Sequence, residues 1–142
     1  RPALVLLPHE RDRHPDHVHA SRLLYDAVFA AGLARIDTGQ EPWRPPRLGY
    51  YLLWDDFVPS FVVDISEQYE RKMACIRAFA SQFSEADARF APTRLTSAEF
   101  SWRLASTMGY WGSRIGTRYG EPYLVYGTLS FPTPLDAAFT SF

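Results

Sequence analysis

The sequence predicts an α/β fold with a mostly parallel sheet, and two observations lead to this fold class. The first is a short apolar run, Ala3 to Leu7, that lies between Pro2 and Pro8 and is typical of a buried strand. The second is the order of the next segments, because a polar loop and then a stretch with helical spacing make half of a parallel β-α-β unit. A length of 142 residues suits one domain with a core, so we expect a single α/β domain over residues 1–142.

The first strand is expected at about residues 2–8, buried on both faces. The helix after it is expected to begin with Asp16 as its N-cap, with Pro15 just outside, and to stop at Gly32. Its apolar positions recur at helical spacing: Ala20, Leu23, Leu24, Ala27, Val28 and Ala31.

The later elements are predicted from composition and caps. Aromatic and β-branched residues predict strands at 48–54 and 61–65, and a last strand at 124–129. A helix capped by Asp64 or Ser66 is expected to continue to Phe83, with Tyr69, Met73, Ile76 and Phe79 on its apolar stripe and Cys75 in the core. After a loop over 84–92, the capping-box pattern Thr96-Ser97-Ala98-Glu99 predicts another helix.

Composition excludes several classes of function. Fifteen basic residues against 16 acidic ones give a net charge of -1, which argues against a general nucleic-acid or membrane-surface binder. No apolar run approaches the roughly 20 residues that a membrane span requires. The lone Cys75 excludes an intramolecular disulfide and a zinc site built from several thiolates. We therefore expect a cytoplasmic protein with no nucleic-acid or membrane partner.

Histidine placement is the one unusual feature of the composition. All four histidines fall within the first 19 residues, and His14 and His17 stand three apart at the start of the expected helix. Residues at this spacing share a helix face, and the loop after a parallel strand is where α/β proteins bind ligands. One imidazole is suited to ligate zinc and the other to donate to an oxyanion, while Asp12 and Asp16 are placed to orient the rings.

The same spacing also fits a solvated, histidine-rich loop whose rings make only turn and capping contacts. A catalytic zinc site normally takes three protein ligands, and nothing downstream supplies a convincing third. Asp55-Asp56 is better explained as a turn, and Asp64 as a helix cap. We expect His9 and His19 to lie on the surface or to support the metal-ligating side chains from behind, without binding the metal themselves.

Residues 10–17, Glu-Arg-Asp-Arg-His-Pro-Asp-His, followed by an alanine-rich amphipathic helix, carry a family resemblance. They resemble the second metal motif of the LmbE/PIG-L-type N-acetylglucosaminyl deacetylases, and within them most closely the bacillithiol-biosynthesis deacetylases. The similarity continues in order through residues 50–51, 59–66, 72–83 and 115–123, and so covers nearly the whole chain.

The resemblance implies a Rossmann-like three-layer fold and hydrolysis of the N-acetyl group of a small amino-sugar substrate, such as N-acetylglucosaminyl malate. It implies Zn2+ as cofactor, with His17 as a metal ligand and His14 as the catalytic group that stabilises the oxyanion, as an imidazolium. It also suggests a homo-oligomer. The residues that bind the substrate stay unknown.

In that family the other metal ligands and the general base belong to an earlier His-Pro-Asp-Asp motif, which these residues lack. The chain thus resembles the C-terminal portion of such an enzyme without the N-terminal β-α units. Alone it is expected to be inactive, with the N-terminal part of the same protein as its partner. The alternative is a non-catalytic α/β fragment or interaction module that binds metal weakly or not at all.

Overall fold

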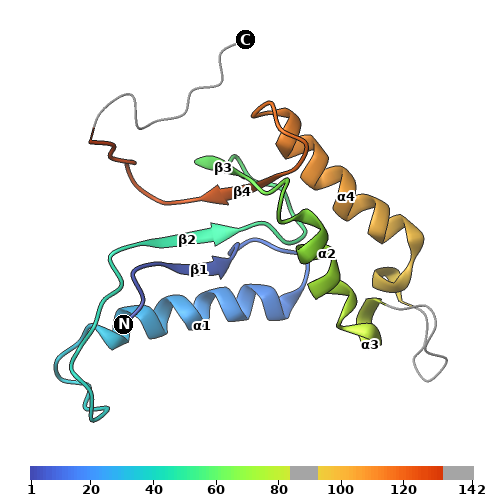
Figure 1. Ribbon diagram of the computed structural model, residues 1–142. Helices are drawn as coiled ribbons and strands as arrows, with labels where there is room; N and C mark the ends of the chain where they lie inside the picture. Colours follow the sequence, from blue (N-terminus) through green and yellow to red (C-terminus); the bar gives the residue numbers. More distant parts are fainter. Residues whose placement is uncertain (84–92, 133–142) are drawn as a thin grey trace. The chain divides into compact units, whose positions relative to one another are not determined.

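A computed structural model describes residues 1–83 and 93–132 of the chain (Figure 1). Strands and helices are interspersed along the described residues, and four of the strands form one sheet, so the fold is mixed α/β. The chain divides into two compact units. In the described residues, unit 1 comprises 1–61 and 122–132, and unit 2 comprises 62–83 and 93–121.

Unit 1 begins with the β-α-β arrangement that the sequence predicts. Strand β1 (Val5–Pro8) leads into helix α1 (Pro15–Ala31), and the chain returns to strand β2 (Leu48–Tyr51). The two strands are parallel, with Leu7 opposite Tyr50, and α1 lies alongside β1 (Figure 1). A helical crossover returns the chain to the starting end of the sheet, which is what parallel pairing requires.

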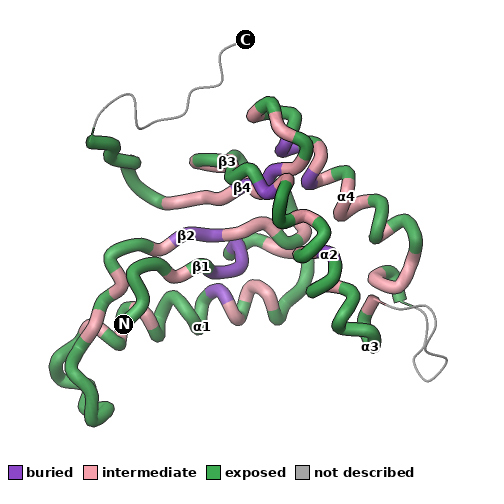
Figure 2. Tube along the Cα trace, viewed as in Figure 1, coloured by how far each residue is buried: buried purple, intermediate pink, exposed green. Residues whose placement is uncertain are grey.

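Burial along β1 differs from the expectation. Leu7 is fully buried, but Leu4 and Leu6, which point to the opposite face, are 48% and 41% exposed (Figure 2). The prediction that β1 is buried on both faces is therefore wrong for this structure. The reason is geometric: successive side chains point to opposite faces, and α1 packs on one of them.

The strand order is β1-β2-β4-β3. Strand β4 (Gly120–Leu124) is antiparallel to β2, with Tyr50 opposite Leu124. Strand β3 (Phe61–Asp64) is also antiparallel to β4: the backbone N–H of residue 60 donates to the carbonyl of 123, and that of residue 65 donates to the carbonyl of 119. Strands β1, β2 and β3 thus run in one direction and β4 runs against them, so the sheet is mixed, and β1 and β2 are the parallel neighbours among the described strands. The prediction of a last strand at 124–129 is wrong in its bounds, because β4 begins four residues earlier and ends at Leu124.

Unit 2 contains four helical segments: α2 (Tyr69–Arg77), α3 (Ala80–Phe83), the 3-10 turn η1 (Arg94–Thr96) and α4 (Ala98–Ser113). Its core forms around Ile65, Met73 and Met108. Partly buried residues pack against them: Tyr69, Ile76, Leu104 and Tyr119. The predicted stripe is thus confirmed for Tyr69, Met73 and Ile76, but Phe79 is 63% exposed and lies between α2 and α3, so one helix continuing to Phe83 is wrong. Cys75 is exposed, and its prediction as a core residue is also wrong.

Three predicted helix starts shift by a few residues. His14, not Asp16, is the N-cap of α1, and Pro15 is the first helical residue, a position where its missing N–H costs nothing. Gln68 precedes α2, while Asp64 caps the turn before it through the N–H of Ser66. Ser97 caps α4 by accepting from the N–H of Phe100.

The predicted loop at 84–92 and the apolar tail beyond 132 lie outside the described residues. Among the residues described, no helix is both long and apolar enough to cross a membrane.

Candidate functional site

The candidate site lies in unit 1, where β1 ends and α1 begins. Strand β1 stops at Pro8, residues 9–13 form the connecting loop, and His14 caps the helix. This is the carboxyl end of β1 next to its parallel neighbour β2, the edge at which α/β sheets bind ligands.

Asp12 organises this loop through hydrogen bonds to both of its carboxylate oxygens. Its Oδ1 accepts from the backbone N–H of His14 at 2.8 Å and lies 2.9 Å from Nδ1 of His17. Its Oδ2 accepts from the backbone N–H of Trp54 at 2.9 Å. The side chain is only 1% exposed, so these donors replace the water that a carboxylate would otherwise bind.

The pKa of Asp12 lies below its usual value. Burial alone would raise the pKa, but the hydrogen bonds from the His14 backbone, the His17 ring and the Trp54 backbone favour the charged form and together outweigh it. Asp12 is therefore an anion at neutral pH.

An ionised carboxylate can only accept, so the His17 nitrogen that faces Asp12 must carry the proton. The neutral ring is then held as the Nδ1–H tautomer, and the lone pair at Nε2 is left available. A carboxylate behind a histidine in this way orients the ring and raises its basicity as a ligand.

His14 has the opposite arrangement. Its Nδ1 accepts from the backbone N–H of Asp16 at 3.2 Å, so in the neutral ring the proton belongs on Nε2. The rings of His14 and His17 stack with centroids 4.8 Å apart and an interplanar angle of 28°. Their side chains are 54% and 39% exposed. One ring thus offers a lone pair and its neighbour offers an N–H donor, both within reach of solvent.

The remaining candidates are placed less uniformly. The carboxylate of Asp16 is 84% exposed and lies 3.9 Å from His14, so Asp16 acts on the ring mainly through its backbone N–H. His19 is exposed. His9 is only 6% exposed and packs against Tyr50 and Phe57, so of the two places expected for it the surface is excluded and a position behind the ligands is left.

Sequence reasoning misses the part that Trp54 plays in this site. Its backbone N–H holds Asp12, and the guanidinium of Arg13 lies 4.4 Å above its ring. Trp54 comes after β2 and is 42 residues away from Asp12. A backbone donor at that distance leaves no pattern in the sequence, and only the parallel pairing of β1 with β2 brings it into place.

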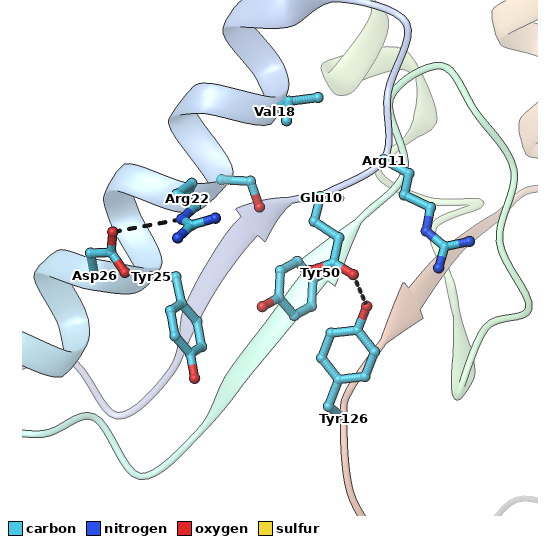
Figure 3. Close-up of a pocket in the computed structure, with 9 residues that line it drawn as sticks. Glu10, Arg11, Val18, Arg22, Tyr25, Asp26, Tyr50 and Tyr126 are labelled. Atoms are coloured by element: carbon cyan, nitrogen blue, oxygen red, sulfur yellow. Dashed lines mark hydrogen bonds and ion pairs between the residues drawn. The ribbon is translucent and has the colours of Figure 1, made fainter.

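Unit 1 also contains a pocket of about 500 Å³ between α1 and the sheet (Figure 3). Tyr126 donates to Glu10 at 2.8 Å, and Arg22 forms an ion pair with Asp26 at 4.0 Å. Burial and the hydrogen bond to Glu10 raise the pKa of Tyr126 to about 12. The lining residues are Glu10, Arg11, Val18, Ser21, Arg22, Tyr25, Asp26, Tyr50 and Tyr126.

A metal needs more ligands than this site provides. Within residues 1–83 and 93–132 there is no group of three His, Cys, Asp or Glu side chains that could hold a metal ion. The histidine pair is thus at most one side of a metal centre.

The chain is similar in sequence to one deacetylase and in structure to further proteins. The chain is 36% identical over 93 residues to the diacetylchitobiose deacetylase of Thermococcus kodakarensis, an alignment that covers 60% of this chain and 34% of that protein. The structure matches the conserved protein TT1542 of Thermus thermophilus with a TM-score of 0.82 and 34% identity, over 97% of this chain and 57% of the other.

A second solved structure carries a stated activity. The N,N'-diacetylchitobiose deacetylase of Pyrococcus horikoshii, bound to an inhibitor, matches with a TM-score of 0.64 and 26% identity, over 86% of this chain and 45% of the other. No protein-family model matches the sequence. The chain spans about a third of the curated relative, and roughly half of each solved structure.

Proposed function

We propose that this chain provides part of the active site of a zinc-dependent deacetylase. The reaction is hydrolysis of the N-acetyl group of an N-acetylglucosaminyl substrate to a free amine and acetate. The observation that carries the proposal is the 2.9 Å contact between Asp12 and His17, which leaves Nε2 of His17 available. Two relatives named as diacetylchitobiose deacetylases support the choice of reaction.

The residues present fit zinc in part. His17 would be the ligand, through Nε2, with Asp12 as the carboxylate that orients it. A bound zinc ion would supply Lewis acidity toward the acetyl carbonyl and lower the pKa of water to roughly 7. Because catalytic zinc takes about three protein ligands, the others would come from outside the described residues.

His14 would stabilise the oxygen that becomes negative when water adds to the acetyl carbon. Its Nδ1 accepts from the N–H of Asp16, so in the neutral ring the proton is on Nε2. That N–H can donate to the developing oxyanion without any change of protonation. The imidazolium implied by the family resemblance also carries an N–H on Nε2, so it can make the same donation.

The rest of the machinery is assigned by resemblance. A His-Pro-Asp-Asp segment would complete the metal site and supply an aspartate as general base, so that this chain would be the C-terminal portion of a cytoplasmic, homo-oligomeric enzyme with a Rossmann-like fold. The base would take a proton from water as the C–O bond forms, and a proton would reach the amine nitrogen as the C–N bond breaks. N-acetylglucosaminyl malate is the substrate we propose to test first, with diacetylchitobiose beside it.

A second candidate is a non-catalytic α/β module with weak or no metal binding. The absence of a three-ligand group among the described residues favours it for the chain alone. Zinc stoichiometry separates the two proposals, because a module has the same weak binding with or without a His-Pro-Asp-Asp segment.

The test compares three histidine variants in a polypeptide that contains both this chain and a His-Pro-Asp-Asp segment. His17→Ala should abolish zinc retention and amine release together. His14→Ala should keep zinc and lose about 10²–10³ in kcat, the loss typical for one oxyanion donor. His19→Ala, on an exposed position of the same helix, is the matched control and should change neither. Unchanged zinc content and rate in His17→Ala would refute the proposal.

A further inference from the structure

His9, next to the site, has a buried imidazole that the proposed function does not use. Its ring lies 4.7 Å from that of Phe57 and meets Tyr50 edge-on at 6.3 Å. A polar ring in such surroundings needs hydrogen-bond partners, because an unpaired buried donor costs free energy. Where His9 places that hydrogen bond determines what it does for the site.

The Nδ1 atom of His9 lies 3.0 Å from the carbonyl oxygen of Arg11. A carbonyl can only accept, so Nδ1 carries the proton and donates. The backbone N–H of His9 donates in turn to the carbonyl of Tyr51, at the end of β2. His9 therefore ties the loop after β1 to the sheet through its backbone, and to the carbonyl two residues further on through its ring.

The Arg11 carbonyl belongs to the same planar peptide group as the N–H of Asp12. Holding that oxygen fixes the plane from which the Asp12 side chain departs, and the Asp12 carboxylate then orients His17 at 2.9 Å. The contacts make a continuous series from the His9 ring, through the Arg11 peptide and Asp12, to the His17 ring.

We infer that His9 is a positioning residue for the candidate metal site: its Nδ1–H holds the loop so that Asp12 keeps His17 in the Nδ1–H tautomer. The inference rests on the proposed function only in taking His17 as the metal-binding group. A residue that merely filled the core would be replaceable by any ring of similar size, whereas a positioning residue must keep its donor.

Two substitutions separate these roles. His9→Phe keeps an aromatic ring between Tyr50 and Phe57 but removes the donor. His9→Asn loses the ring but places an amide N–H near the position of Nδ1, and so restores the donor to the Arg11 carbonyl. Phe57→Leu is the matched control, because it disturbs the packing around His9 and leaves the hydrogen bond intact.

The readout is the tautomer of His17 in the full chain, measured by long-range proton–nitrogen NMR. We expect the Nδ1–H form in the wild type, in His9→Asn and in Phe57→Leu, and its loss to a mixture in His9→Phe. If His9→Phe does not fold, His9→Gln takes its place, because its longer side chain carries the amide away from the Nδ1 position.

An unchanged His17 tautomer in the variants that lack the donor would overturn the inference, as would an equal loss in His9→Asn. No metal and no substrate enters this measurement, so its failure is distinct from failure of the proposed deacetylase. In a polypeptide that retains zinc, His9→Phe should also weaken zinc binding about tenfold or more, the range seen when the group behind a metal-binding histidine is removed.

Discussion

Asp12→Asn perturbs the candidate site with the least change of shape. The carboxylate accepts three N–H donors through two oxygens, whereas the amide has one oxygen that accepts and one nitrogen that donates. If the oxygen faces His14 and His17, the amide nitrogen meets the N–H of Trp54. If the amide flips, its nitrogen faces the N–H of His14 and forces the His17 proton from Nδ1 to Nε2.

Either orientation leaves at least one donor unpaired at a side chain that is 1% exposed. An unsatisfied buried donor costs about 1–3 kcal/mol, and the remaining hydrogen bonds lose their charge-assisted strength. We expect the free energy of unfolding to fall by about 2 kcal/mol. The flipped amide also removes the lone pair at Nε2 of His17, so zinc binding should weaken about 10- to 100-fold.

Urea unfolding monitored by circular dichroism measures the loss of stability. Zinc titration of a polypeptide that contains both this chain and a His-Pro-Asp-Asp segment measures the loss of zinc affinity. Asp16→Asn is the matched control, because its carboxylate is 84% exposed, and we expect a change within about 0.5 kcal/mol. A free energy of unfolding for Asp12→Asn within about 0.5 kcal/mol of the wild type would contradict this role of Asp12, as would equal zinc affinity in the two variants.

Two further predictions concern other parts of the chain. Gly112→Ala places a Cβ 2.6 Å from the backbone nitrogen of Tyr119, so the free energy of unfolding in urea should fall by about 1–3 kcal/mol. In the control Gly109→Ala, on the same helix, the added Cβ meets no atom within 4 Å, and the free energy of unfolding should rise by up to about 1 kcal/mol. Similar effects of the two substitutions would contradict the packing of unit 2. Tyr126, with its pKa raised to about 12, should ionise at higher pH than an ordinary tyrosine in an absorbance titration. Its contribution to stability is present below about pH 10 and is lost toward pH 12. Glu10→Gln should lower the pKa of Tyr126, and an unchanged titration would refute the hydrogen bond between Tyr126 and Glu10.

The local part of the site can be predicted from the sequence. A strand, a short loop and a helix with histidines three apart are fixed by neighbours in the chain, and these elements are confirmed. Asp12 can be singled out beside His17, since it lies only five residues away. The sequence predicts a role for Asp16 through its carboxylate, but the contact in the structure is its backbone N–H, because His14 and not Asp16 caps the helix.

The long-range part cannot be predicted. Burial of His9 depends on Tyr50 and Phe57, more than 40 residues away. The position of the Asp12 carboxylate depends on the hydrogen bond from the backbone N–H of Trp54. No spacing within one segment encodes these contacts, since they arise only when β2 pairs with β1.

The start of strand β4 is mispredicted for a related reason. Gly120 and Pro122 are typical of a turn, so the sequence places the start of the strand at 124. In the structure Gly120 starts the strand because the backbone of Trp111 in α4 approaches it closely: an added Cβ would lie 2.7 Å from the Trp111 carbonyl carbon. The glycine is required by packing and not by a turn, a distinction that needs the neighbouring helix to be known.

In the proposed function, His14 and His17 form one side of a zinc site that is completed from outside the described residues. Cobalt titration tests it most directly, because the absorption of Co2+ reports tetrahedral coordination. We predict weak binding without a tetrahedral spectrum for this chain alone, and one tetrahedral ion per chain when a His-Pro-Asp-Asp segment is present, lost in His17→Ala. A tight one-to-one tetrahedral complex with the chain alone, or one that survives His17→Ala, would contradict the account.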